Sequence, residues 1–304
     1  MLVMTNKLVN QSEHMAFFKT ALALRGSVTP KVIGNVILLT IYACIITYLT
    51  YIYPALALPI GPFEYGGLVL GLILVFRVNA GHDRWWEARK LWGNIVNQSR
   101  NLTMIIVNYT HTKDKNWLLT ITNHIAALPY LIKELLRGNN KNEAIKHLMN
   151  DQTYEKLLRS ENLPNTMSSI IAYELQVARD EHGLDPFAFI RAEEQREQLT
   201  NAQGACERIL KTPMPFVMAI KIRRFILIFL LALPFGFVGD ALYIAPCISG
   251  IVAYALLSLD QIGIELQNPF AVKNLSHLPL NEICKSIEEN VVEIRKESLD
   301  RNLI

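Results

Sequence analysis

The sequence predicts an all-α membrane protein with four transmembrane helices and a helical domain in the cytoplasm. Two observations lead to this fold class. Apolar residues make up 51% of the chain while charged residues still make up 19%, which fits a membrane part joined to a water-facing part. Lysine and arginine are also missing from two long apolar stretches, Val32–Phe76 and Phe225–Val272, although they occur throughout the rest of the chain.

Each base-free stretch is long enough to cross a bilayer twice, since one spanning helix needs about 20 apolar residues. A turn rich in proline and glycine divides each stretch, at residues 53–63 and 233–246. Both turns lack bases, whereas the flanking segments are rich in them. The positive-inside rule therefore predicts four crossings of the inner (plasma) membrane, with both termini in the cytoplasm.

Five segments follow along the chain. We expect a cytoplasmic N-terminal segment over 1–30, the first two spans over 31–80, the cytoplasmic helical domain over 81–212, the last two spans over 213–260, and a cytoplasmic C-terminal segment over 261–304.

The first span is expected to begin with Thr29 as N-cap and Pro30 at the first helical position, and to end near Tyr53. The other spans are expected over about Phe63–Val78, Val217–Val238 and Leu242–Leu259. The block between the second and third spans shows apolar residues at helical spacing and no strand-like alternation, so it is expected to be helical. Gly138 and Gly183 lie where C-terminal helix caps are expected.

A row of side chains at four-residue spacing marks the second span: Glu64, Leu68, Leu72 and Phe76. Residues at this spacing lie on one face of a helix. One interpretation is an ordinary packing face whose acid lies among the outer headgroups. The other is a pore lining, in which several copies surround an axis and their apolar rings gate by dewetting. The spacing alone leaves both open.

The chain carries little that suggests catalysis. The seven histidines form no zinc-binding pattern and no glycine-rich phosphate loop follows a strand, so we expect no enzyme and no cofactor. The net charge of +3 is small and the lysines and arginines are scattered along the chain, which argues against nucleic-acid binding. A transporter, or a receptor whose cytoplasmic domain binds a partner, is the alternative from another class. Transporters usually carry ionisable residues at mid-membrane, and these spans lack them.

Five segments together resemble the bestrophin family, in particular its bacterial members. They are FRVNAGHDRWWEARKLWG (76–93), LRGSV (24–28), GACERILKTPMPF (204–216), IELQNPF (264–270) and LPLNEIC (278–284). The resemblance implies a homopentameric ion channel in the membrane lipid that conducts monovalent ions. It also implies a hydrophobic neck at Leu68, Leu72 and Phe76. In the pore interpretation of the row, Glu64 adds an acidic ring at the outer mouth. Leu175 is the candidate for a second apolar ring at a cytoplasmic aperture.

Two departures from the family pattern affect regulation and selectivity. The acidic cluster that holds calcium in animal members is reduced here to Asp260 and Glu265, so calcium regulation is not expected. Animal members resemble anion channels, whereas bacterial members can favour cations. Because Glu64 would attract cations and the row carries no base, monovalent cations are slightly favoured over chloride. The positive ring edge of Phe76 keeps the anion alternative open.

The segment 76–93 also carries tryptophans and alternating charges. Trp85, Trp86 and Trp92 are interpreted as anchors at the membrane interface. The charged residues are expected to pair within and between subunits and so form a collar below the neck; they are Asp83, Arg84, Glu87 and Arg89.

Overall fold

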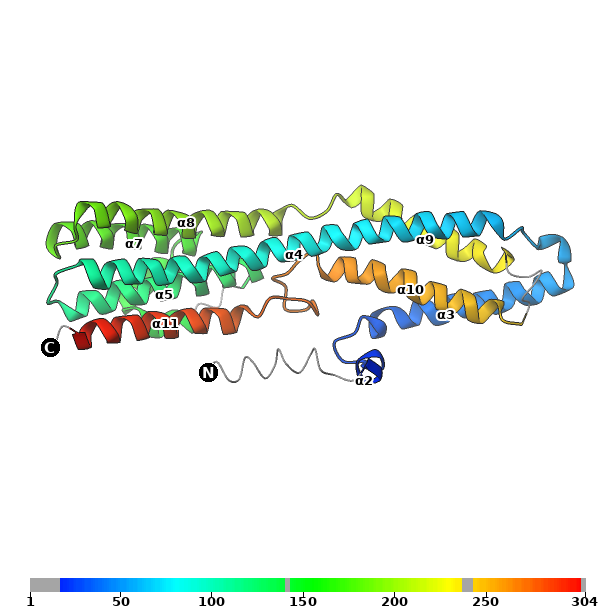
Figure 1. The fold of residues 1–304 in the computed structure, drawn as a ribbon, viewed down its shortest axis with the longest axis horizontal. Coiled ribbons are helices and arrows are strands. Elements are labelled where there is room, and N and C mark those ends of the chain that lie inside the picture. The colour runs from blue at the N-terminus through cyan, green and yellow to red at the C-terminus, as the bar shows by residue number, and fades with distance from the viewer. Residues whose placement is uncertain (1–16, 140–142, 237–242, 302–304) are drawn as a thin grey trace. The chain divides into compact units, whose positions relative to one another are not determined.

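The computed structural model describes residues 17–139, 143–236 and 243–301, and every regular element within these ranges is a helix (Figure 1). The elements are α2 (Phe17–Ala21), α3 (Thr29–Ile52), η1 (Pro54–Leu56), α4 (Gly61–Tyr109), α5 (Lys115–Arg137), η2 (Glu143–Leu148), α6 (Asp151–Leu158), α7 (Leu163–Glu181), α8 (Pro186–Lys211), α9 (Phe216–Gly236), α10 (Ala245–Glu265) and α11 (Leu280–Arg301). The all-helical fold class is confirmed.

The chain divides into two compact units, and α4 contributes residues to both. The first unit comprises Met1–Gly81 and Pro215–Glu265, and the second comprises His82–Met214 and Leu266–Ile304.

Within the first unit, α3 packs along α10. Gly250 permits this close approach, because a Cβ at that position would lie only 2.6 Å from Oγ1 of Thr40. The core of this unit joins α4, α9 and α10 and consists of Leu70, Leu74, Ile222, Ile226, Leu230, Ala253 and Leu256.

Among the described helices, α3, α4 and α10 are long and apolar enough to cross a membrane. The third predicted span coincides with α9, which is 21 residues long. Lys221, Arg223 and Arg224 lie in its first half. Because of these three charges, α9 does not count among the helices that are apolar enough to cross a membrane.

Several predicted boundaries differ from those observed. Helix α3 includes Thr29 as its first residue, and the hydroxyl of Ser27 accepts a hydrogen bond from the Thr29 amide at 3.1 Å, so Thr29 is not the N-cap. The second predicted span, about Phe63–Val78, lies within α4, which continues to Tyr109 because no proline interrupts it. Helix α10 runs past Leu259 to Glu265. The predicted turn at Gly239 and Asp240 lies outside the described residues.

The second unit packs the remainder of α4 with α5, α7, α8 and α11 around one apolar core (Figure 1). Gly138 and Gly183 have φ values of 66° and 68°, so both predicted C-terminal caps are confirmed. At the N-terminal ends of α5 and α8, the carboxylates of Asp114 and Asp185 accept hydrogen bonds from backbone amides.

Candidate functional site

The predicted row of side chains lies on an exposed face of α4. Leu68, Leu72 and Phe76 are 73%, 54% and 60% exposed, and Glu64, one turn before Leu68, is exposed as well. On the opposite side of the helix, Leu74 is fully buried in the core of the first unit. The protomer therefore presents three large apolar side chains in a row that no described part of the same unit covers.

Helix geometry determines how the row runs. With 3.6 residues per turn, each step of four residues advances by about 40° around the helix axis. The row from Glu64 to Phe76 therefore stays on one side of α4 but spirals slowly across it. Helices that turned this whole row toward a common axis would have to cross that axis at an angle.

The residue after Phe76 is a buried arginine. Arg77 is 1% exposed, and its Nη1 lies 2.7 Å from Oδ1 of Asp260 on α10. Arg223 on α9 approaches the same carboxylate from its other side, with Nε 3.1 Å from Oδ2. One aspartate thus links three helices, and the pairing fixes the rotation of α4 that leaves Phe76 exposed.

A glycine makes room for this arginine. A Cβ at Gly263 would lie 3.3 Å from both Cγ and Nε of Arg77, so a larger side chain there would crowd the arginine. Nearby on the same helix, Glu265 accepts a hydrogen bond from Lys31 Nζ at 2.6 Å. Sequence reasoning missed both pairings, since a lone acid near a span end carries no signal for its partner.

Beyond Arg77 in segment 76–93, Arg84 and Trp85 make contacts within the second unit. Arg84 donates hydrogen bonds to the backbone carbonyls of Ile209, Thr212 and Gln267. Burial lowers the pKa of this guanidinium, although Glu87 opposes the shift. Arg84 therefore joins α4 to the C-terminal end of α8 and to the chain that follows α10. Pairing between copies stays a prediction.

The structure contradicts the interpretation of the tryptophans as interface anchors at one of the three positions, and for Trp85 and Trp86 it stays a prediction. Trp92 is fully buried in the second core, so it is a core residue and not an interface anchor. The indole Nε1 of Trp85 donates to the carbonyl of Ser276 at 2.7 Å. Trp86 is half exposed.

Leu175 lies in the middle of α7 and has no exposed surface. It belongs to the core of the second unit, where the buried face of α7 meets α5 and α8. A side chain enclosed within its own protomer is not available to line an opening, so the structure gives no support to Leu175 as an aperture residue. The spacing of the apolar residues on α7 is explained by core packing.

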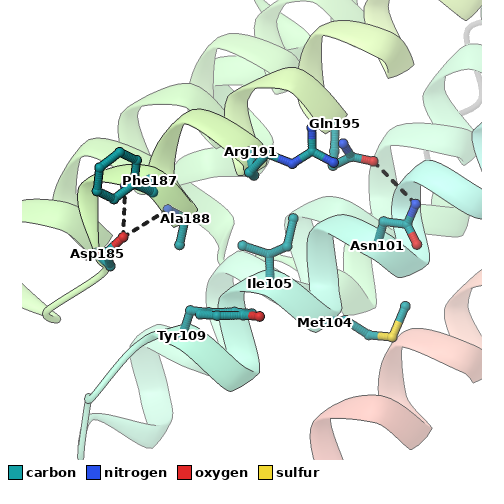
Figure 2. A pocket seen from close by; sticks show the side chains of 9 residues that line it. All are labelled: Asn101, Met104, Ile105, Tyr109, Asp185, Phe187, Ala188, Arg191 and Gln195. Carbon is teal, nitrogen blue, oxygen red and sulfur yellow. Dashed lines mark hydrogen bonds between the residues drawn. The ribbon is translucent and has the colours of Figure 1, made fainter.

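A groove of about 520 Å³ lies in the second unit between α4 and α8 (Figure 2). Its polar groups are already engaged: Asp185 caps α8, Arg191 pairs with Glu194 at 2.6 Å, and Asn101 donates to Gln195. Of the remaining lining residues, Tyr109 is polar only at its hydroxyl, and Met104, Ile105, Phe187 and Ala188 are apolar. This lining offers no set of acid, base and nucleophile.

Two titratable side chains elsewhere in the second unit, His124 and Cys206, are buried in its interior and uncharged. His124 is 2% exposed, and burial lowers its pKa to about 4, so the ring is neutral at pH 7. Burial raises the pKa of the Cys206 thiol to about 12, which keeps it protonated. Within the described ranges, no three side chains of His, Cys, Asp or Glu are grouped as a metal site.

Three membrane-length helices and a separate folded helical unit define a helical membrane protein. The chain belongs to the bacterial and fungal bestrophin family, whose family profile matches residues 7–293. The predicted resemblance is thereby confirmed over nearly the whole chain.

Related proteins are described as ion channels. A voltage-dependent anion channel-forming protein of Nostoc sp. is 32% identical over 281 residues, which cover 91% of each chain. The protein YneE of Escherichia coli K12, described in the same words, is 29% identical over 275 residues and 90% of each chain. A crystal structure of a bacterial bestrophin homologue from Klebsiella pneumoniae superposes with a TM-score of 0.81 at 27% identity, over 87% of this chain and 98% of that one.

These findings establish an ion-channel family and not a family of enzymes. They do not support the expected preference for cations, because the matching relatives are named for anion conduction. The cation expectation rested on Glu64, on the absence of a base from the row, and on the resemblance to bacterial members. One acid at the end of a helix does not determine which ion passes the narrowest part of a pore.

Proposed function

We propose that the protein is a homopentameric channel that conducts small monovalent anions passively through a central pore. One observation carries this proposal: the exposed row of Leu68, Leu72 and Phe76 on a membrane-length helix whose other side is locked into the protomer core. Five copies of α4 around an axis would turn each of these side chains into a ring. Closed rotational symmetry lets identical copies assemble in this way.

Such a neck would gate by controlling water. Leucine and phenylalanine rings offer no hydrogen bonds, so a narrow passage between them empties of water and an ion loses its hydration on entry. Phe76 would form the ring of the neck nearest the cytoplasm, and Glu64 would form an acidic ring at the outer mouth. Smaller side chains in the neck would keep it wet and raise the resting flux.

We further propose that the protein crosses the inner membrane four times, through α3, the first part of α4, α9 and α10. The bases of α9 lie in its first half, where long side chains can extend to the cytoplasmic headgroups. Residues 81–212 and 261–304 would then lie in the cytoplasm, together with the N-terminal segment 1–30.

The preference for anions is supported by the names of the relatives and by the ring edge of Phe76, which carries partial positive charge. Cation selectivity is the competing possibility, favoured by the exposed carboxylate of Glu64. Reversal potentials measured in a salt gradient separate the two.

The function is tested by ion flux into sealed vesicles that contain the purified protein. Leu72→Ala is expected to raise passive chloride flux at least severalfold. Ile37→Ala is the matched control, because Ile37 is also 54% exposed but lies on α3, away from the row. Equal flux in wild type, Leu72→Ala and Phe76→Ala would refute the neck. Flux that saturates with substrate concentration would indicate a transporter instead.

A further inference from the structure

A groove of about 480 Å³ in the first unit lies between α3, α9 and α10, and its two ends differ in chemistry. One end is charged and polar and is formed by Lys31, Asn35, Arg223, Asp260 and Gln261. The other end is apolar and is formed mainly by Leu38, Leu39, Leu227 and Leu230. A cavity of this size and polarity suits an amphiphile, with a polar group at one end and an alkyl chain at the other.

The charges at the polar end are unequal. Three bases, Lys31, Arg77 and Arg223, meet two acids, Asp260 and Glu265. Arg77 is buried, so the excess positive charge reaches the surface through the other two bases, whose side chains are 39% and 56% exposed. An anionic group is therefore the complementary partner.

Arg223 has donors to spare for such a group. Among the described residues, its hydrogen bond to Asp260 goes through Nε, which leaves the two terminal NH2 groups of the guanidinium for a further acceptor. A guanidinium held in place on one side by a carboxylate loses little freedom when it binds a phosphate on the other. The side chain of Asn35, exposed at the same end, adds another donor.

The groove as a whole has the length, and its apolar end the openness, that a lipid with an acyl chain requires. From Lys31 to Leu38, α3 rises by about 10 Å, which is most of one leaflet of the hydrocarbon core. Leu38 and Leu227 are 66% and 52% exposed, so the groove opens sideways and not into a closed core. An acyl chain lying there would cover both leucines.

We propose that this groove binds an anionic phospholipid, with the headgroup phosphate on Lys31 and Arg223 and one acyl chain along Leu38 and Leu227. The proposal rests on the membrane insertion proposed above and not on ion conduction. Occupancy would brace α3, α9 and α10 at the end where Asp260 ties the helices together. The lipid is therefore expected to stabilise the fold of the first unit.

The test measures phosphatidylglycerol and phosphatidylcholine bound to the delipidated full-length protein in detergent, by native mass spectrometry. Wild type is expected to retain phosphatidylglycerol in preference. Arg223→Gln is expected to weaken that binding about fivefold, the effect of removing one base near an anionic lipid. Arg224→Gln is the matched control, because Arg224 is also exposed on α9 but does not line the groove.

A second pair of variants tests the acyl end without touching a charge. Leu227→Trp would fill the groove and is expected to abolish selective retention, whereas Ile228→Trp, on the neighbouring face of α9, is expected to leave it intact.

Equal loss in both arginine variants would mean nonspecific surface attraction and would overturn the site. Loss of assembly in Leu227→Trp, with no lipid bound to wild type, would mean that a second copy covers the groove. Chloride flux is recorded separately, so a failed channel with intact lipid binding refutes only the channel.

Discussion

Arg77 and Asp260 form a buried ion pair between α4 and α10, with Nη1 and Oδ1 2.7 Å apart and side chains only 2% and 10% exposed. Arg77 directly follows Phe76 in the chain. It holds α4 at the rotation in which the buried face of the helix meets the core and the opposite face, with its apolar row, stays uncovered. Packing within the chain thus leaves this apolar surface uncovered.

Removing this arginine is expected to destabilise the protein. Arg77→Met leaves Asp260 buried with Arg223 as its remaining partner, and breaking a buried pair costs about 3 kcal/mol at the lower end of the usual range. The midpoint of thermal unfolding in detergent should fall by about 5–10 °C. Arg224→Gln, on the exposed side of α9, should change it little. Equal midpoints in Arg77→Met and wild type would show that the pair contributes nothing to stability.

The second unit is expected to lose stability in mild acid through His124. Its pKa is lowered by burial to about 4 from an ordinary value of 6.5, so the unfolded chain binds a proton more readily than the folded one. The stabilising effect of a neutral ring is complete above the ordinary pKa and falls away as the pH drops toward 4. Between pH 7 and pH 5 the loss is about 2 kcal/mol.

Replacing this histidine tests the origin of the acid sensitivity. His124→Leu should show a smaller difference between the unfolding midpoints at pH 7 and pH 5 than wild type does. His111→Gln, at an exposed position, should keep the full difference. If His124→Leu were as sensitive to acid as wild type, another group would be responsible.

Charge at the outer mouth is expected to oppose anion entry. A ring of five Glu64 carboxylates would repel chloride, so Glu64→Gln should raise chloride conductance about threefold at low ionic strength and less at high salt. Glu64→Asp keeps the charge and should resemble wild type. Single-channel recording in planar bilayers measures both. Unchanged conductance in Glu64→Gln would mean that this side chain does not face the ion path.

Assembly is expected to follow closed five-fold symmetry. Five copies of the 34.5 kDa chain make a particle of about 170 kDa without detergent. Native mass spectrometry gives this value directly. Leu72→Ala should keep the same number of chains, because in the proposed pore the neck side chains would face the axis and not the contacts between neighbours. A particle of one or two chains would contradict the pore.

The sequence predicted the helical class and the family well, because both depend on properties that persist along the chain. The absence of lysine and arginine identifies Val32–Phe76 as a membrane segment without any knowledge of its tertiary contacts. Four-residue spacing likewise places Leu72 and Phe76 on one face of any helix. The tertiary contacts could not be predicted from the sequence alone. The pairing of Arg77 with Asp260 joins residues far apart in the chain, and the spacing of Leu175 on α7 suits a core as well as a pore.

The most direct test of the account places a reactive thiol in the neck. The exposed cysteines Cys44 and Cys247 are first replaced by serine; Cys206 and Cys284 are buried, with pKa values raised to about 12. A water-soluble, charged thiol reagent should then block ion flux through Leu72→Cys in sealed vesicles, because position 72 would face the ion path. The same reagent should leave flux through Ile37→Cys unchanged. Flux through Leu72→Cys that survives the reagent, with the thiol unmodified, would contradict a pore lined by α4.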